Sequence, residues 1–187
     1  FYKACKDSNV KPIIGCELSV EYASHRGPLV LLVTNETGYL NLVETVSALY
    51  TNTEAVSEDR KSIKFEYLRE KSEGLICLTG GYEGIISNLY RSQKTEEAET
   101  FLKELLEFFK DKLYIEIQRL GFKEEDVLEN YLIDLAYKND IALVATNNCY
   151  FPNPDYYEAH DALLCIEAGR YVVEDDRYKV TPHHYVK

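Results

Sequence analysis

Apolar positions along the chain follow two patterns, continuous runs and helical stripes, and the two alternate. Three runs are almost wholly apolar: Leu29–Val33, Leu75–Leu78 and Ile141–Ala145. Such runs are typical of strands buried on both faces, because neither face then needs polar side chains. The sequence therefore predicts three buried strands that helices cover.

Helical periodicity marks residues 39–50, 96–110 and 124–138. Thr95 is a suitable N-cap for the second of these helices. A fourth helix is expected from Pro154, at its first turn, to Gly169, just past its end. Residues 1–9 resemble the last turns of a helix that ends at Asn9. The side chains expected to face the core are Leu42, Val46, Leu49 and Tyr50, then Phe101, Leu105, Phe108 and Phe109, then Val127, Leu128, Tyr131, Leu132 and Leu135.

Residues 113–118 alternate strictly, so Leu113, Ile115 and Ile117 share one face of a strand and Glu116 points to the other. Strands that alternate with helices indicate right-handed crossovers and a mainly parallel sheet, either open or closed into a barrel. After the last helix, residues 172–177 suggest a loop and residues 178–180 a short edge strand.

Composition narrows the class of protein. The chain has 187 residues, which fits one domain, and 21 Lys plus Arg against 32 Asp plus Glu give a net charge of −11. An acidic surface repels phosphate backbones, so this chain is a poor nucleic-acid clamp. Five scattered cysteines without a Cys-x-x-Cys pair indicate free thiols in a reducing compartment. Because the sequence has neither an apolar run of about 18 residues nor a secretory leader, we expect a cytoplasmic protein. The non-methionine start suggests a piece of a longer polypeptide.

The stretch Val144–Phe151 has the form of an active site, since an apolar strand delivers polar residues to its carboxyl end. Yet Asn148 and Tyr150 are poor ligands for a hard or borderline cation. Nucleophile-elbow and phosphate-loop motifs are both missing from the sequence.

Four segments, taken together in order and spacing, resemble one family. They are Pro12–Glu17, Leu31–Leu42, Glu73–Gly80 and Ala145–Asn148 with Ala159–Ile166. They are similar to the polymerase-and-histidinol-phosphatase (PHP) domain at the N-terminus of the bacterial DNA polymerase III alpha subunit. The resemblance implies a distorted seven-stranded α/β barrel, incomplete here because the first βα units would lie upstream. Residues 1–170 would form this domain, and 171–187 would lead towards the polymerase palm.

Active members of that family hold up to three metal ions at the strand ends, Zn or Mn, for phosphoester hydrolysis. Of the ligand positions this chain covers, only Glu17 matches the family's residue. The others correspond to Pro28, Gly81, Asn148 and Tyr150, which offer no suitable set of donors. We therefore expect neither catalytic residues nor a cofactor here, Glu17 being a vestigial ligand.

The resemblance then implies a scaffold within a replicative polymerase. Such a domain docks the proofreading exonuclease subunit and other holoenzyme subunits, while DNA contact and Mg-dependent polymerisation belong to the rest of the parent chain. Tyr150 could fill the vacated ligand pocket and hydrogen-bond Glu17 through its hydroxyl. An incomplete barrel would also expose long apolar strand edges and favour self-association.

Other interpretations stay open at this point. A metal-dependent phosphoesterase or pyrophosphatase could use Glu17, Glu116 and His25. The simpler interpretation of Glu116 is an ion pair with Arg119 or Lys112. A wholly different α/β domain is a third possibility. Unless His25 is a displaced metal ligand, we expect it to be a solvated turn residue. We expect His160 and Asp161 to be structural, and His183 and His184 to lie in an exposed segment.

Overall fold

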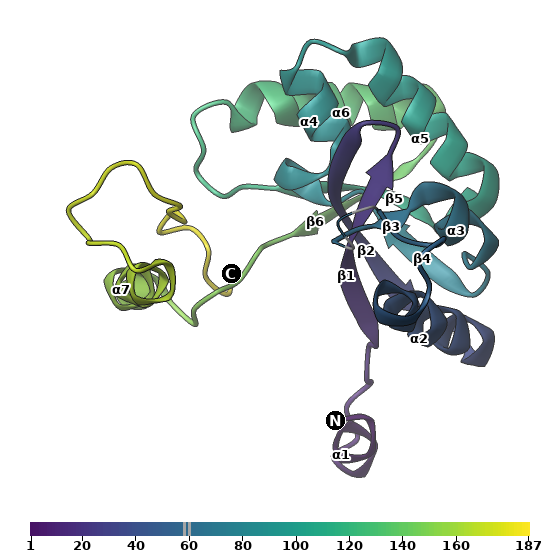
Figure 1. The fold of residues 1–187 in the computed structure, drawn as a ribbon, viewed down its shortest axis with the longest axis horizontal. Coiled ribbons are helices and arrows are strands. Elements are labelled where there is room, and N and C mark those ends of the chain that lie inside the picture. The colour runs from purple at the N-terminus through teal and green to yellow at the C-terminus, as the bar shows by residue number, and fades with distance from the viewer. Residues whose placement is uncertain (58, 60) are drawn as a thin grey trace.

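A six-stranded sheet in the order β3-β1-β2-β4-β5-β6 organises the chain (Figure 1). The computed structural model describes residues 1–57, 59 and 61–187. The strands are β1 (Gly15–Tyr22), β2 (His25–Val33), β3 (Ile63–Lys64), β4 (Leu75–Leu78), β5 (Leu113–Gln118) and β6 (Ala142–Thr146). The predicted strand at 113–118 is thus confirmed to the residue.

The sheet is mixed, whereas alternation along the sequence predicted a mainly parallel one. Strands β1 and β2 form a hairpin in which Tyr22 pairs with His25, and β2 is also antiparallel to β4. The pairings β1–β3, β4–β5 and β5–β6 are parallel. The difference arises because a two-residue turn, with Ala23 at a φ of 51°, can join only antiparallel strands.

Seven helices and three short 3-10 segments complete the described part of the chain. The predicted helices are confirmed, although the N-cap of α5 is Lys94 and not Thr95, which is its first helical residue. The first helix ends at Asp7, two residues before the predicted Asn9. The helices are α1 (Tyr2–Asp7), α2 (Glu36–Thr51), α3 (Phe65–Glu70), α4 (Ile85–Arg91), α5 (Thr95–Phe109), α6 (Glu125–Asn139) and α7 (Tyr157–Ala168), and the 3-10 segments are η1 (Gly81–Glu83), η2 (Lys110–Lys112) and η3 (Pro154–Tyr156).

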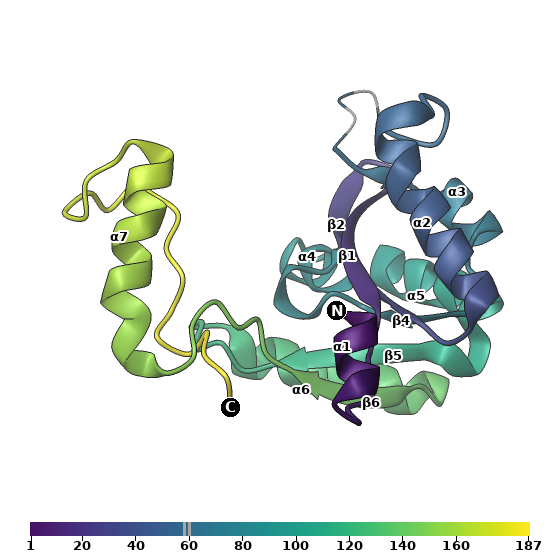
Figure 2. The same cartoon turned by 90° about the horizontal axis from the view of Figure 1, so that it is seen from below.

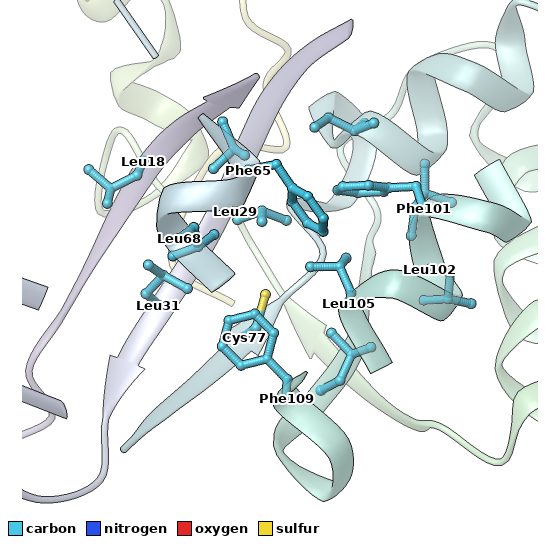
Figure 3. Packing of buried hydrophobic residues seen from close by; sticks show 14 of the residues in the cluster. Leu18, Leu29, Leu31, Phe65, Leu68, Cys77, Phe101, Leu102, Leu105 and Phe109 are labelled. Atoms are coloured by element: carbon cyan, nitrogen blue, oxygen red, sulfur yellow. The ribbon is translucent and has the colours of Figure 1, made fainter. Parts of the chain in front are cut away.

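The hydrophobic core lies between one face of the sheet and helices α2 to α6 (Figure 3). Phe101 and Leu105 of α5 and Leu29 and Leu31 of β2 are all fully buried members of this core. Aromatic rings fill the centre, where Phe65 lies 5.4 Å from Phe101 between ring centroids. Because all five helices pack on this face, the opposite face, which carries Glu17 and Glu116, is left for other contacts.

Three predictions about burial are wrong. Tyr50 and Val127 were expected in the core but are 80% and 61% exposed, because they lie at the edges of their helical stripes. The run at Ile141–Ala145 was expected to be buried on both faces. Instead β6 is largely exposed, since it is an edge strand that pairs with β5 alone among the described residues.

The C-terminal part of the chain forms an arm beside the sheet. In both views α7 stands apart from the other helices (Figures 1 and 2). The segment 178–180 is not a strand, contrary to the prediction, but its Val180 is buried, and Tyr185 makes an isolated bridge with Phe151. In the described residues, all helices are too short or too polar to cross a membrane.

Candidate functional site

The carboxyl ends of β4, β5 and β6 meet at one edge of the sheet, because the three strands run parallel. This edge carries Thr79 after β4, Gln118 at the end of β5 and Thr146 at the end of β6. Open and barrel α/β folds place their binding groups at such an edge. We therefore take this polar cluster as the candidate site.

The carboxylate of Glu116 lies at its centre and is only 3% exposed. It accepts hydrogen bonds from the backbone N–H of Gly80 at 3.0 Å, from the side-chain amide of Gln118 at 3.4 Å and from the hydroxyl of Thr146. These donors satisfy a buried charge without a cation. The predicted ion pair of Glu116 with Arg119 or Lys112 is wrong, because Arg119 points away and pairs with Glu129.

The turn after β4 is shaped to reach this carboxylate. Gly80 has a φ of +81°, and a Cβ there would lie 2.0 Å from the carbonyl oxygen of Pro28. A Cβ on Gly81 would lie 2.3 Å from the side chain of Gln118. Only glycine fits such close approaches. Pro28 and Gly81, both expected at lost ligand positions, are therefore brought to the same site, where backbone packs closely.

Glu17 projects from β1 on the same face of the sheet as Glu116, and solvent reaches its side chain. Partial burial raises the pKa of Glu17, and the charges of Glu83 and Glu116 raise it further. The three carboxylates thus influence one another electrostatically. In the described part of the chain, however, no group of three or more His, Cys, Asp or Glu side chains is arranged to hold a metal ion.

The loop after β6 is clasped by the C-terminal segment. The side-chain amide of Asn147 donates to the carbonyl of His183 at 3.0 Å, and the N–H of Tyr150 donates to the carbonyl of His184 at 2.9 Å. On the other side, Thr181 donates its hydroxyl to the carbonyl of Leu120. The segment therefore joins the loop after β5 to the loop after β6.

Tyr150 does not contact Glu17, so the predicted hydrogen bond between them is wrong. Its hydroxyl accepts a bond from Asn148 at 3.3 Å, and burial together with a hydrogen bond to Tyr150 raises the pKa of Tyr178 to about 12. The Tyr150 ring lies 5.2 Å from the ring of His160 and 5.5 Å from that of His184. The two expected lost ligands on this loop, Asn148 and Tyr150, thus contact each other, and Tyr150 also contacts the C-terminal arm.

The histidines lie outside the polar cluster. His25 begins β2, and its Nε2 is 3.1 Å from the carboxylate of Glu97, so it is not merely a solvated turn residue. Asp161 is structural, as predicted, because it binds Arg177 through two hydrogen bonds of 2.6 Å. His184 was expected to be exposed, but it is 2% exposed and its Nδ1 lies 3.1 Å from the backbone nitrogen of Thr181.

Sequence reasoning missed the polar residues that build the cluster, namely Thr79, Gly80, Gln118 and Thr146. Each follows or ends an apolar strand, which is one signal in the sequence. Thr79, Gly80 and Thr146 also lie within the segments that resemble the family. Their mutual contacts depend on which strands become neighbours. Strand order is a property of the fold and cannot be obtained from local pattern.

Fold and site together define an α/β domain with a polar cluster at the strand ends. The chain belongs to the PHP domain family, whose model matches residues 1–120. This match sets aside the interpretation as an unrelated α/β domain.

Among curated proteins, the chain is similar to DNA polymerase III subunit alpha from several bacteria. It is 42% identical to that of Caulobacter vibrioides over 190 residues, which cover 97% of this chain and 16% of that protein. The subunit from Rickettsia bellii is 39% identical over 95% of this chain and 15% of its own length. The subunit from Pseudomonas aeruginosa is 32% identical over 95% of this chain and 15% of its own length. The chain thus spans a small part of the relatives it matches.

Proposed function

We propose that this chain is the PHP portion of the alpha subunit of a bacterial replicative DNA polymerase, with residues 1–170 as the domain and 171–187 as its exit segment. The similarity to alpha subunits over nearly the whole chain supports this assignment. Nucleotidyl transfer, its Mg²⁺ and the contact with DNA belong to other parts of that subunit. The six strands described here would be part of a seven-stranded barrel of the PHP type.

Within that polymerase, the domain acts as a catalytically silent scaffold in the bacterial cytoplasm. The observation that carries this proposal is the hydrogen-bonded state of Glu116. Its carboxylate oxygens already accept from Gly80, Gln118 and Thr146, in a place where a metallohydrolase would direct such oxygens at a cation. Pro28 and Gly81 beside it have no side-chain donor atoms for a metal. A site built this way stabilises strand ends and needs no cofactor.

The scaffold's partner is the proofreading exonuclease subunit, together with other subunits of the holoenzyme. The test is a titration of the alpha subunit that contains this chain, and of the chain itself once circular dichroism shows it folded, with the cognate exonuclease. Moderate salt is needed because the net charge of −11 otherwise promotes non-specific attraction. Saturable one-to-one binding by both samples is expected. Binding by neither folded sample would refute the docking role.

A second candidate, a metal-dependent phosphoesterase or pyrophosphatase, draws on the grouping of Glu17 with Glu83 and Glu116. Burial raises the pKa of Glu17, and the negative charges of Glu83 and Glu116 raise it further; a bound cation would relieve that repulsion. The test is elemental analysis for Zn and Mn, with hydrolysis of a phosphodiester by the wild type, by Glu17→Ala and by the surface control Glu107→Ala. Stoichiometric metal and turnover lost only in Glu17→Ala would replace the silent scaffold by this function.

A further inference from the structure

Helix α7 and the turn after it expose several apolar side chains. Leu163 and Ile166 of the helix are 63% and 77% exposed, and Tyr171 and Val173 of the turn are 75% and 88% exposed. We call these residues, together with Val172, the α7 surface. Exposed apolar side chains that form a patch mark interaction sites. The arm that carries these residues stands apart from the other helices (Figure 2).

Contacts within the arm hold it in shape. Cys165 is 4% exposed, and the Asp161–Arg177 pair, whose oxygens and nitrogens lie 2.6 Å apart, ties the turn back onto the helix. The N–H of Arg170 also donates to the carbonyl of Cys165 at 2.9 Å. The exposed side chains therefore project from a preformed support, which lowers the entropy cost of binding.

The charges around the α7 surface are mainly negative. Its nearby cations are already paired, Arg170 with Glu174 at 2.6 Å and Lys179 with Asp175 at 3.3 Å. In the part of the chain that the structure describes, no cation lies within ion-pair distance of Glu158 or Glu167, both exposed on the helix. The rim thus presents carboxylates that a partner could neutralise.

We propose that the α7 surface binds a helical segment of a partner protein that presents apolar side chains flanked by lysine or arginine. Such a segment would cover the apolar residues and pair with the rim carboxylates. A second copy of this chain is a poor occupant, because its carboxylates would face identical ones. Nucleic acid and anionic lipid are repelled for the same reason. The proposal goes beyond the scaffold role and holds whichever subunit supplies the segment.

The test uses the whole 187-residue chain and a synthetic helical peptide with leucines on one face and lysines on both flanks. Because α7 has 12 residues, a peptide of about 18 residues, roughly 27 Å as a helix, is long enough to cover it. Binding is followed by fluorescence anisotropy at moderate salt. The same peptide with glutamates in place of the lysines reports on charge, and one with serines in place of the leucines reports on the apolar contact.

Matched variants locate the site. Ile166→Ser should weaken binding by about tenfold, since a well-buried aliphatic anchor contributes that much or more. Val127→Ser, on the similarly exposed surface of α6, should leave it unchanged. Glu167→Lys should weaken binding in a salt-dependent way, whereas Glu107→Lys on α5 should have little effect. All four positions are exposed, so the variants are expected to fold, which circular dichroism checks.

Three results would overturn the proposal. One is equal binding of the lysine and glutamate peptides. Another is an equal loss of affinity for the lysine peptide in Ile166→Ser and Val127→Ser. The third is a dimer of the chain in sedimentation equilibrium that Ile166→Ser dissociates, because the occupant would then be a second copy. Binding of the lysine peptide that depends on Ile166 and Glu167, but not on Val127 and Glu107, supports it.

Discussion

The hydrogen-bonded carboxylate of Glu116 gives the sharpest test of how the strand ends are held. Replacing Glu116 by alanine removes the acceptor of the Gly80 N–H, at 3.0 Å, and of the Thr146 hydroxyl. The bond from Gln118 is 3.4 Å long and contributes less. Because the residue is 3% exposed, water cannot readily take the carboxylate's place.

The expected loss follows from these contacts. A hydrogen bond to a charged group contributes roughly 1.5–3 kcal/mol, and two good ones would give about 3–6 kcal/mol. Part of this is offset because the carboxylate no longer has to be desolvated. We therefore expect Glu116→Ala to lower the free energy of unfolding by about 2–4 kcal/mol. Glu116→Gln keeps an acceptor for Gly80 and should cost about 1 kcal/mol.

Urea unfolding followed by circular dichroism measures these differences. With a slope near 2 kcal/mol/M, a loss of about 3 kcal/mol moves the midpoint down by roughly 1.5 M urea. Glu107→Ala is the matched control, since it removes an exposed glutamate of α5 and should change stability by less than about 0.5 kcal/mol. A midpoint for Glu116→Ala equal to that of the control would refute the structural role of the carboxylate.

Three further predictions concern the arm and the backbone. Arg177→Ala should speed hydrogen exchange of residues 171–180, and unchanged exchange would contradict the role of the Asp161–Arg177 pair. The hydrogen bonds from Arg177 hold the pKa of the Asp161 carboxyl below its ordinary value of 3.8. The stability that the pair contributes is therefore present above pH 3.8 and is lost as pH falls through the lowered pKa. Gly38→Ala should lower the free energy of unfolding by about 3 kcal/mol or more, because the new Cβ would lie 1.9 Å from the carbonyl oxygen of Gly74. Gly169→Ala, with a φ of +63° but no atom within 4 Å of the new Cβ, should lower it by about 1 kcal/mol. Equal urea midpoints for the two variants would refute this expectation. Burial lowers the pKa of His184 below its ordinary value of 6.5, so the folded state binds the proton less readily than the unfolded state. Stability should therefore fall as pH drops below 6.5 in the wild type, and fall less in His184→Gln. Parallel pH profiles of the two proteins in thermal unfolding would contradict this prediction.

Most of the local elements could be predicted from the amino-acid sequence alone. Strand 113–118 and the helices near residues 39, 96, 124 and 154 form as periodicity and end signals predicted. These patterns are local, because a helix or strand must place apolar side chains at intervals of its own geometry. The resemblance carried by four spaced motifs likewise identified the family, which the match over residues 1–120 confirms.

Tertiary structure decided where each element lies and what each polar group contacts. The run at Ile141–Ala145 has a core-like composition, yet β6 is an exposed edge because only β5 pairs with it among the described strands. Glu116 was expected to pair with a cation nearby in sequence. Its donors come instead from residues 80 and 146, which only the order of the strands brings together.

The same holds for Tyr150 and His184, whose contacts link a loop to the C-terminal segment. A buried polar group must find a partner, but the sequence does not say which one. That choice is made when distant segments pack, because hydrogen bonds are satisfied by whichever donors the fold places within reach.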